Sequence, residues 1–239
     1  ANENSYKLKS NLNHQNFDTG IFKETKIDPK EVLPYIDWSP FFWAWDLKGT
    51  YPKIFDNKKY GVQAKKLFED AEVHLKEIIE KNIFNLQYCY GLFHAKRRGN
   101  DIDIFVSKER ENKIQTFHYL RQQEKKENDT HFHCLADFLS STDHSESYLG
   151  AFAVSAGKEV EEYAKTFEKK HDDYTSIIIK ILGDRFAEGM AEYLHHKIRK
   201  ITTNNDESAL TNEDLIKEKY KGIRPAPGYP ACPDHSEKM

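Results

Sequence analysis

The chain ends in residues 221–239, KGIRPAPGYPACPDHSEKM, where groups that could bind a ligand lie in a proline-rich stretch. Arg224 offers a planar guanidinium that suits a carboxylate. Gly228 allows a ligand to approach the backbone closely, and Tyr229 supplies an aromatic face. These residue types favour a ligand-binding edge, although a surface loop that merely covers the core could have the same composition.

The prolines of this stretch restrict its backbone. Each proline lacks an amide donor and fixes its own φ, so the stretch forms neither a helix nor a central strand. Pro225 also restricts the backbone of Arg224, which precedes it. We expect an extended ribbon in which the amides of Ala226, Gly228 and Tyr229 point outward as unpaired donors.

A row of carboxylates forms a second candidate. Asp184, Glu188 and Glu192 are spaced four residues apart within a predicted helix, so they lie on one face and repel one another. One interpretation is a solvated face with basic neighbours. The other is a surface that meets a cationic or proton-exchanging partner, and periodicity alone does not choose between them.

The cysteines and histidines indicate no metal site. His131 and His133, which precede Cys134, alternate as they would on one face of a strand, but no second pair of ligands at a suitable spacing accompanies them. Cys89, Cys134 and Cys232 are too widely spaced for a CxxC metal site, and their odd number argues against a disulfide framework. Free buried thiols in a reducing compartment are expected.

Composition excludes several classes of protein. The 239 residues include 36 Lys and Arg against 39 Asp and Glu, a net charge of −3, which implies no general attraction to nucleic acid or to an anionic membrane. The longest apolar runs are too short to span a bilayer, and the N-terminus lacks the apolar core of a signal peptide. We therefore expect a cytoplasmic protein.

The periodicity of apolar residues predicts an α+β fold. Residues 1–29 are polar and are expected to be an N-terminal linker or arm, and the domain proper is expected over residues 30–239. Apolar spacing predicts a long helix capped by Asp172 or Asp173. The predicted elements are helices over 63–81 and 171–200 and strands over 86–95, 101–106, 112–120 and 147–157. Their order favours a twisted antiparallel meander flanked by helices.

Six segments of the chain, in the same order, resemble the activation domain of cobalamin-dependent methionine synthase. They are YIDWSPFFWAWDLKGTYPKIF (35–55), LRQQ (120–123), CLADF (134–138), YLGAFAV (148–154), HDDYTSIIIKILGDRFAEGMAEYLH (171–195) and YKGIRPAPGYPACPDH (220–235). The resemblance extends from about residue 30 to the end of the chain. It implies a curved single domain with its ligand in a shallow groove along the sheet edge.

The resemblance also implies a function. In that family the domain binds S-adenosylmethionine and supports the reductive methylation of cob(II)alamin to methylcobalamin. The expected partners are the cobalamin-binding module of methionine synthase, which carries the cobalamin, and a flavodoxin or flavodoxin-like reductase. The domain would thus belong to a 5-methyltetrahydrofolate–homocysteine methyltransferase, although alone it would not make methionine.

Individual roles follow from the same resemblance. Asp37 would bind the amino group of S-adenosylmethionine, and Arg224 its carboxylate. The backbone of Pro225, Ala226, Gly228 and Tyr229 would hold the rest of the ligand. Asp184, Glu188 and Glu218 match acidic positions near the cobalamin interface.

The chain departs from the family after the Cys-Pro-Asp-His block, where a further C-terminal segment is expected and this sequence stops at Met239. Two alternatives therefore stay open. One is a stand-alone accessory protein that reactivates another corrinoid enzyme. The other is a docking module without chemistry of its own, in which the acidic helix meets a partner and the proline ribbon is structural.

Overall fold

The computed structural model describes residues 19–124, 132–140, 147–202, 210–211, 214–215, 219–220 and 223–236. Its strands are β1 (Gly20–Thr25), β2 (Gln87–Arg98), β3 (Asp101–Phe105), β4 (Lys113–His118) and β5 (Ser147–Ser155). Its α-helices are α1 (Pro29–Val32), α2 (Ser39–Trp43), α3 (Gly61–Glu80), α4 (Glu159–Glu168) and α5 (Asp173–Thr202). Short 3-10 helices occupy Leu33–Tyr35, Lys53–Asp56 and Leu135–Phe138. None of the described helices is both long enough and apolar enough to cross a membrane.

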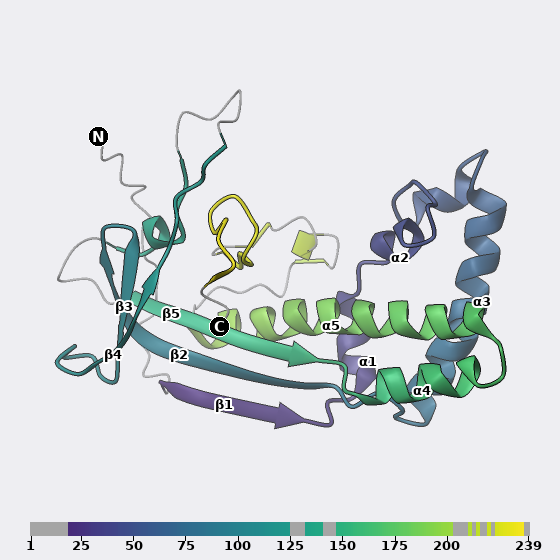
Figure 1. Ribbon diagram of the computed structural model, residues 1–239, viewed down its shortest axis with the longest axis horizontal. Helices are drawn as coiled ribbons and strands as arrows, with labels where there is room; N and C mark the ends of the chain where they lie inside the picture. The colour runs from purple at the N-terminus through teal and green to yellow at the C-terminus, as the bar shows by residue number, and fades with distance from the viewer. Residues whose placement is uncertain are drawn as a thin grey trace.

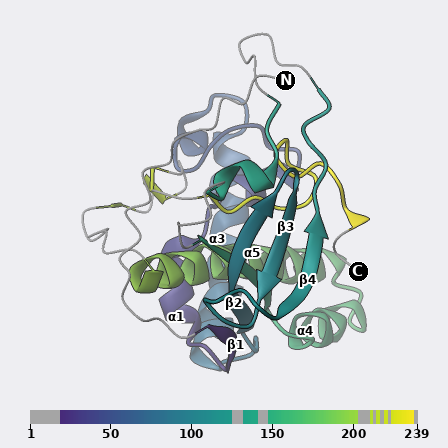
Figure 2. The ribbon, with the colours of Figure 1, turned by 90° about the vertical axis from the view of Figure 1, so that its left-hand side faces the viewer.

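The five strands form one antiparallel sheet centred on the long strand β2 (Figure 1). β1 pairs with residues 87–92 of β2 and β3 pairs with residues 94–98, so these two strands share one edge of β2. β5 covers the opposite edge over residues 87–95, and β4 extends the sheet beyond β3. Figure 2 shows β2, β3 and β4 side by side in front of α5. The stretch RRGND, residues 97–101, has the composition of a hairpin turn, and it joins β2 to β3 in an antiparallel hairpin with Gly99 at φ +66°.

Helix α5 is the long apolar element around which the main core forms. Its buried residues Ile178, Leu182, Phe186, Met190 and Leu194 repeat every four positions, as the sequence predicted. Asp172 caps the helix by accepting a hydrogen bond from the Thr175 amide at 3.0 Å. This core also includes residues of α1, α2, α3 and the first half of β2.

A second, smaller core lies at the other end of β2. Ala95, Ile102 and Ile104 from the sheet pack there with Cys134 and Ala136 from the 132–140 segment. Since Ile102 and Ile104 lie on β3, this small core stabilises the β3–β4 end of the sheet separately from α5.

The α+β class and the antiparallel sheet with flanking helices are confirmed, and two details differ from the expectation. Residues 20–25, which the sequence placed in an N-terminal arm, form β1 and pair with β2. The β2–β3–β4 part is a meander, but β5 returns to pair with β2 instead of continuing from β4. Backbone pairing with β2 orders β1 although its side chains are mostly exposed.

Candidate functional site

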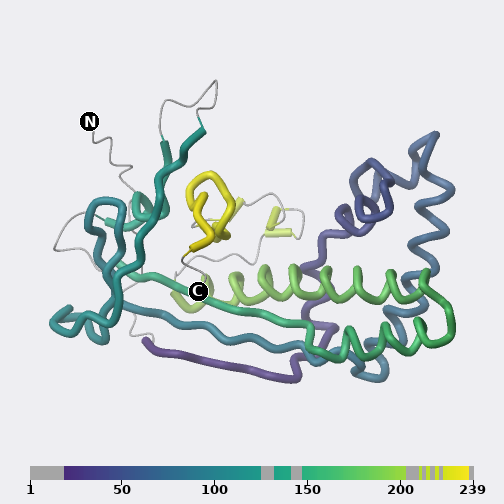
Figure 3. The backbone as a smooth tube through the Cα atoms, in the orientation of Figure 1, coloured from purple at the N-terminus to yellow at the C-terminus, as the bar shows by residue number. Residues whose placement is uncertain are grey.

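The C-terminal ribbon, residues 223–236, lies over α5 and is attached to it by a buried ion pair. Figure 3 shows the ribbon between the β3–β4 end of the sheet and α2. Arg224 Nη2 donates to Glu192 Oε2 on α5 at 2.8 Å. The two side chains are 23% and 10% exposed, so this pair is largely shielded from water. Arg224 is thereby held at the surface of α5, with part of its guanidinium still accessible.

The backbone of the ribbon corrects the expectation of outward amide donors. The Gly228 amide donates to the Cys232 carbonyl at 2.8 Å, and the Tyr229 amide donates to the Ala226 carbonyl at 3.1 Å. Gly228 adopts φ +102°, a conformation that suits glycine. The prolines therefore support a compact turn, and only the Ala226 amide of the three lacks a hydrogen bond in the described chain. The Tyr229 side chain, 60% exposed, still presents its aromatic ring to solvent.

Asp37 lies in the turn between the 3-10 helix Leu33–Tyr35 and α2. One of its carboxylate oxygens, Oδ1, accepts the Ser39 amide at 2.9 Å, which fixes the half-buried side chain at the start of α2. No other hydrogen bond to Asp37 is formed by the described residues. The second oxygen is therefore available for a cationic group.

The segment around Asp37 is fastened to the same part of α5 that holds Arg224. Tyr35 Oη and His196 Nδ1 are hydrogen-bonded at 2.8 Å. Ile36 packs so closely on α5 that a Cβ at Gly189 would lie 3.0 Å from Ile36 Cγ1. Gly189 and Glu192 are three residues apart, about 4.5 Å along a helix. Ile36, next to Asp37, and Arg224 thus contact α5 at positions that lie less than one helical turn apart along its axis.

The acidic row predicted on α5 divides into an exposed and a covered part. Asp184 and Glu188 are exposed and form no ion pair with the described residues. Glu192, 8% exposed, lies where the ribbon crosses the helix and is paired with Arg224. The repulsion expected along the row is therefore offset at Glu192. Glu218, the other acidic candidate, lies outside the described residues.

Glu192 belongs to a buried polar cluster whose importance the sequence analysis missed. Arg199, 4% exposed, places Nη1 3.8 Å from Glu192 Oε1. The same Nη1 donates to His195 Nδ1 at 2.6 Å, and the guanidinium stacks 3.8 Å from the centre of the Tyr220 ring. Burial, followed by the charges of Arg199 and Arg224, lowers the pKa of His195 to about 3. The i, i+3 and i, i+7 spacing of residues 192, 195 and 199 is the helical pattern that could have indicated the cluster.

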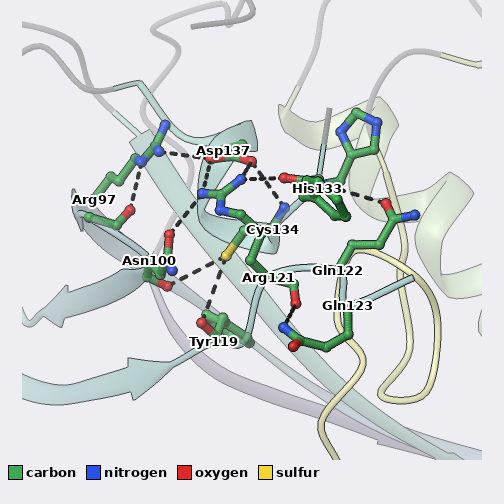
Figure 4. Close-up of polar contacts among 11 residues, drawn as sticks. Arg97, Asn100, Tyr119, Arg121, Gln122, Gln123, His133, Cys134 and Asp137 are labelled. Atoms are coloured by element: carbon green, nitrogen blue, oxygen red, sulfur yellow. Dashed lines mark hydrogen bonds and ion pairs between the residues drawn. The ribbon is translucent and has the colours of Figure 1, made fainter. Parts of the chain in front are cut away.

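A second polar network, shown in Figure 4, joins two segments that carry the family resemblance. Arg121 of LRQQ forms a forked ion pair with Asp137 of CLADF, with Nη2 2.9 Å from Oδ1. Arg97 Nη2 donates to the same Oδ1 at 2.7 Å, and the Cys134 amide donates to Oδ2 at 3.0 Å. Burial raises the pKa of Asp137, but its hydrogen bonds to Arg121 and Cys134 outweigh this effect and hold the pKa below its usual range.

The contacts of this network join segments of the chain to one another and indicate a structural role. His133 and Cys134 lie in it, but burial raises the pKa of the Cys134 thiol, which disfavours the thiolate that binds metals. Within the part of the chain that the structure describes, no group of three His, Cys, Asp or Glu side chains could hold a metal ion. His131 lies outside that part.

Comparison with known proteins identifies the family. The family model described as "Vitamin B12 dependent methionine synthase, activation domain" matches residues 28–239. A solved structure entitled "Crystal Structure of the MetH Reactivation Domain bound to AdoHcy" is 43% identical, with a TM-score of 0.83, over 92% of this chain and 68% of that one. The sequence resemblance is therefore confirmed by both comparisons, and the chain belongs to the activation-domain family of vitamin B12-dependent methionine synthase.

Proposed function

We propose that this domain binds S-adenosylmethionine across α5, between the Asp37 turn and the C-terminal ribbon. The observation that carries the proposal is the fold shared with a reactivation domain whose solved structure contains AdoHcy, the demethylated form of this ligand. S-adenosylmethionine supplies a methyl group activated by its sulfonium. The domain is part of a methyltransferase family, and its proposed role is reactivation by reductive methylation of cob(II)alamin rather than methionine synthesis itself.

The chemistry of the two anchoring side chains fits the amino-acid portion of the ligand. Arg224 is partly exposed, and its Nη1 has no acceptor among the described residues and, unlike Nε, is not buried, so a ligand carboxylate would bind the guanidinium there. Asp37 has a carboxylate oxygen available for the ligand amino group. The Ala226 amide and the exposed Tyr229 ring, on the turn that follows Pro225, would contact the remainder, with Gly228 allowing close approach.

We further propose that the exposed carboxylates Asp184 and Glu188 face the cobalamin-binding module, together with Glu218. The exposure of Asp184 and Glu188, and the absence of ion pairs between them and the described residues, support this role, since surface carboxylates that meet a partner need no partner within the domain. The proposed electron donor is a flavodoxin or flavodoxin-like reductase, and the proposed setting is the cytoplasm. Of the sequence alternatives, reactivation of another corrinoid enzyme would also depend on a ligand bound through Arg224, whereas docking without chemistry would not.

Calorimetric titration with S-adenosylmethionine tests the binding proposal. We expect saturable binding that Asp37→Ala and Arg224→Ala each weaken by about tenfold or more, because each removes one charge-assisted hydrogen bond. Glu80→Gln, an exposed carboxylate on α3, is the matched control and should bind as the unmodified chain does. A folded chain that binds no S-adenosylmethionine would contradict the proposal.

A further inference from the structure

We propose that Glu192 positions Arg224 for recognition of the ligand's carboxylate, and that Arg199 fixes Glu192 in turn. This inference rests on the proposed S-adenosylmethionine site and adds two α5 residues to it. Glu192, the covered residue of the acidic row, thereby has a role different from that proposed for the exposed residues Asp184 and Glu188. The consequence is a preference for ligands that carry a carboxylate.

Arg224 needs an anchor because its own backbone provides little. Residues 223–226 belong to no helix or strand, and a long arginine side chain there has many rotamers. Its only ion pair with the described residues is the 2.8 Å contact between Nη2 and Glu192 Oε2. Glu192 is on a long helix that packs into the main core, so its contact with Arg224 restrains the Arg224 side chain relative to α5.

Glu192 is itself held in place. Arg199 lies seven residues later on α5, about two turns along the helix and on the same face. Its Nη1 is 3.8 Å from Glu192 Oε1, while Glu192 Oε2 accepts from Arg224. The guanidinium of Arg199 is in turn fixed by the Tyr220 ring and by His195. The two oxygens of Glu192 therefore face different arginines: Oε2 accepts a hydrogen bond from Arg224, and Oε1 lies within ion-pair distance of Arg199 without a hydrogen bond.

The pairing with Glu192 leaves part of Arg224 for a ligand. Glu192 engages Nη2 and Nε is buried, so the guanidinium nitrogen left for a ligand is Nη1, which has no acceptor among the described residues. A guanidinium has five N–H donors, so Arg224 can bind Glu192 and a ligand carboxylate together. Glu192 thus acts through Arg224 as a positioning residue, and it is not expected to contact the ligand.

A comparison of two ligands distinguishes positioning from a general structural role. The probes are S-adenosylmethionine and its decarboxylated form, which differ only in the carboxylate. Both are titrated into the 239-residue chain and into Glu192→Gln, Arg224→Ala and the control Glu80→Gln. The measured quantity is the ratio of the two dissociation constants, with a thermal melt of each variant to establish folding.

We expect the unmodified chain to prefer the carboxylate-bearing ligand and Arg224→Ala to lose this preference. Glu192→Gln should reduce the preference by about tenfold, because an uncharged amide holds the guanidinium less firmly. Glu80→Gln should retain it.

Three results would overturn the inference. Glu192→Gln could keep the full preference while Arg224→Ala loses it, or it could weaken both ligands equally, which would indicate a purely structural role. It could also bind S-adenosylmethionine more tightly, which would mean that Glu192 competes with the ligand for Arg224. Failure of the unmodified chain to bind either probe is a separate result, which contradicts the proposed function and removes the premise of the inference.

Discussion

At the scale of single residues, His195 illustrates how the buried cluster on α5 depends on protonation. Its Nδ1 accepts a hydrogen bond from Arg199, which a protonated imidazole could not do. Burial and the neighbouring charges of Arg199, Arg224 and His196 lower its pKa to about 3. A histidine in an unfolded chain has a pKa of about 6.5. Between these pH values the unfolded chain binds more protons, so stability falls as the pH is lowered from the unfolded value towards the folded one.

His195→Gln should therefore reduce the acid sensitivity of folding. We expect its free energy of unfolding to decline less steeply than that of the unmodified chain between about pH 6 and pH 4, by at most about 1.4 kcal/mol per pH unit for one proton. Urea denaturation at a series of pH values measures the difference. His118→Gln, at an exposed position, is the control. Parallel pH profiles for the unmodified chain and His195→Gln would contradict the assigned pKa shift.

At the scale of elements, the contact between α4 and α5 depends on the absence of a side chain at Gly183. A Cβ there would lie 2.5 Å from Val160 Cγ1 and 3.0 Å from Val160 Cγ2. Val160 is β-branched and has little rotamer freedom with which to move aside. The two helices therefore approach more closely than an alanine would permit.

We expect Gly183→Ala to lower the free energy of unfolding by about 1–3 kcal/mol, despite the better helix propensity of alanine. The double variant Gly183→Ala/Val160→Ala should recover part of this loss, because it removes the clash. Denaturant unfolding of both single variants and the double variant gives the coupling energy. Additive effects, or a stabilising Gly183→Ala, would show that the helices separate at little cost.

The elements also show what could be read from the sequence. The long helix, the hairpin at Gly99 and the strands of the meander follow from local periodicity and turn chemistry, and all are confirmed. β1 was missed because backbone pairing with β2 orders it, and its exposed side chains give no apolar pattern. In the candidate site, Arg224 was predicted from its residue type and from the family resemblance, and Asp37 from the resemblance alone. The pairing of Glu192 with Arg224 joins positions 32 apart in sequence, so local patterns do not reveal it.

At the scale of the whole molecule, the domain has two cores, and strands β2 and β5 contribute residues to both. The main core surrounds α5, and the smaller one lies under β3 and the 132–140 segment. The smaller core has few buried residues, and the network of Arg97, Arg121 and Asp137 lies at its edge (Figure 4), so we expect the network to contribute to its stability. Regions with little buried apolar surface tend to open separately from the rest of a protein.

Removing the shared carboxylate should therefore loosen one end of the molecule. Asp137→Ala leaves Arg97 and Arg121 without this partner and removes the acceptor of the Cys134 amide. We expect the opening free energy of β3 and β4 amides to fall by about 1–3 kcal/mol, with α5 amides unchanged. Native-state hydrogen exchange measures both regions in one sample, and Asp101→Ala, whose ion pairs involve the exposed side chains of Arg98 and His118, is the control. An equal fall in α5 would mean that the two cores open as one cooperative unit, and the Arg224 site would then share its stability with the distant end of the sheet.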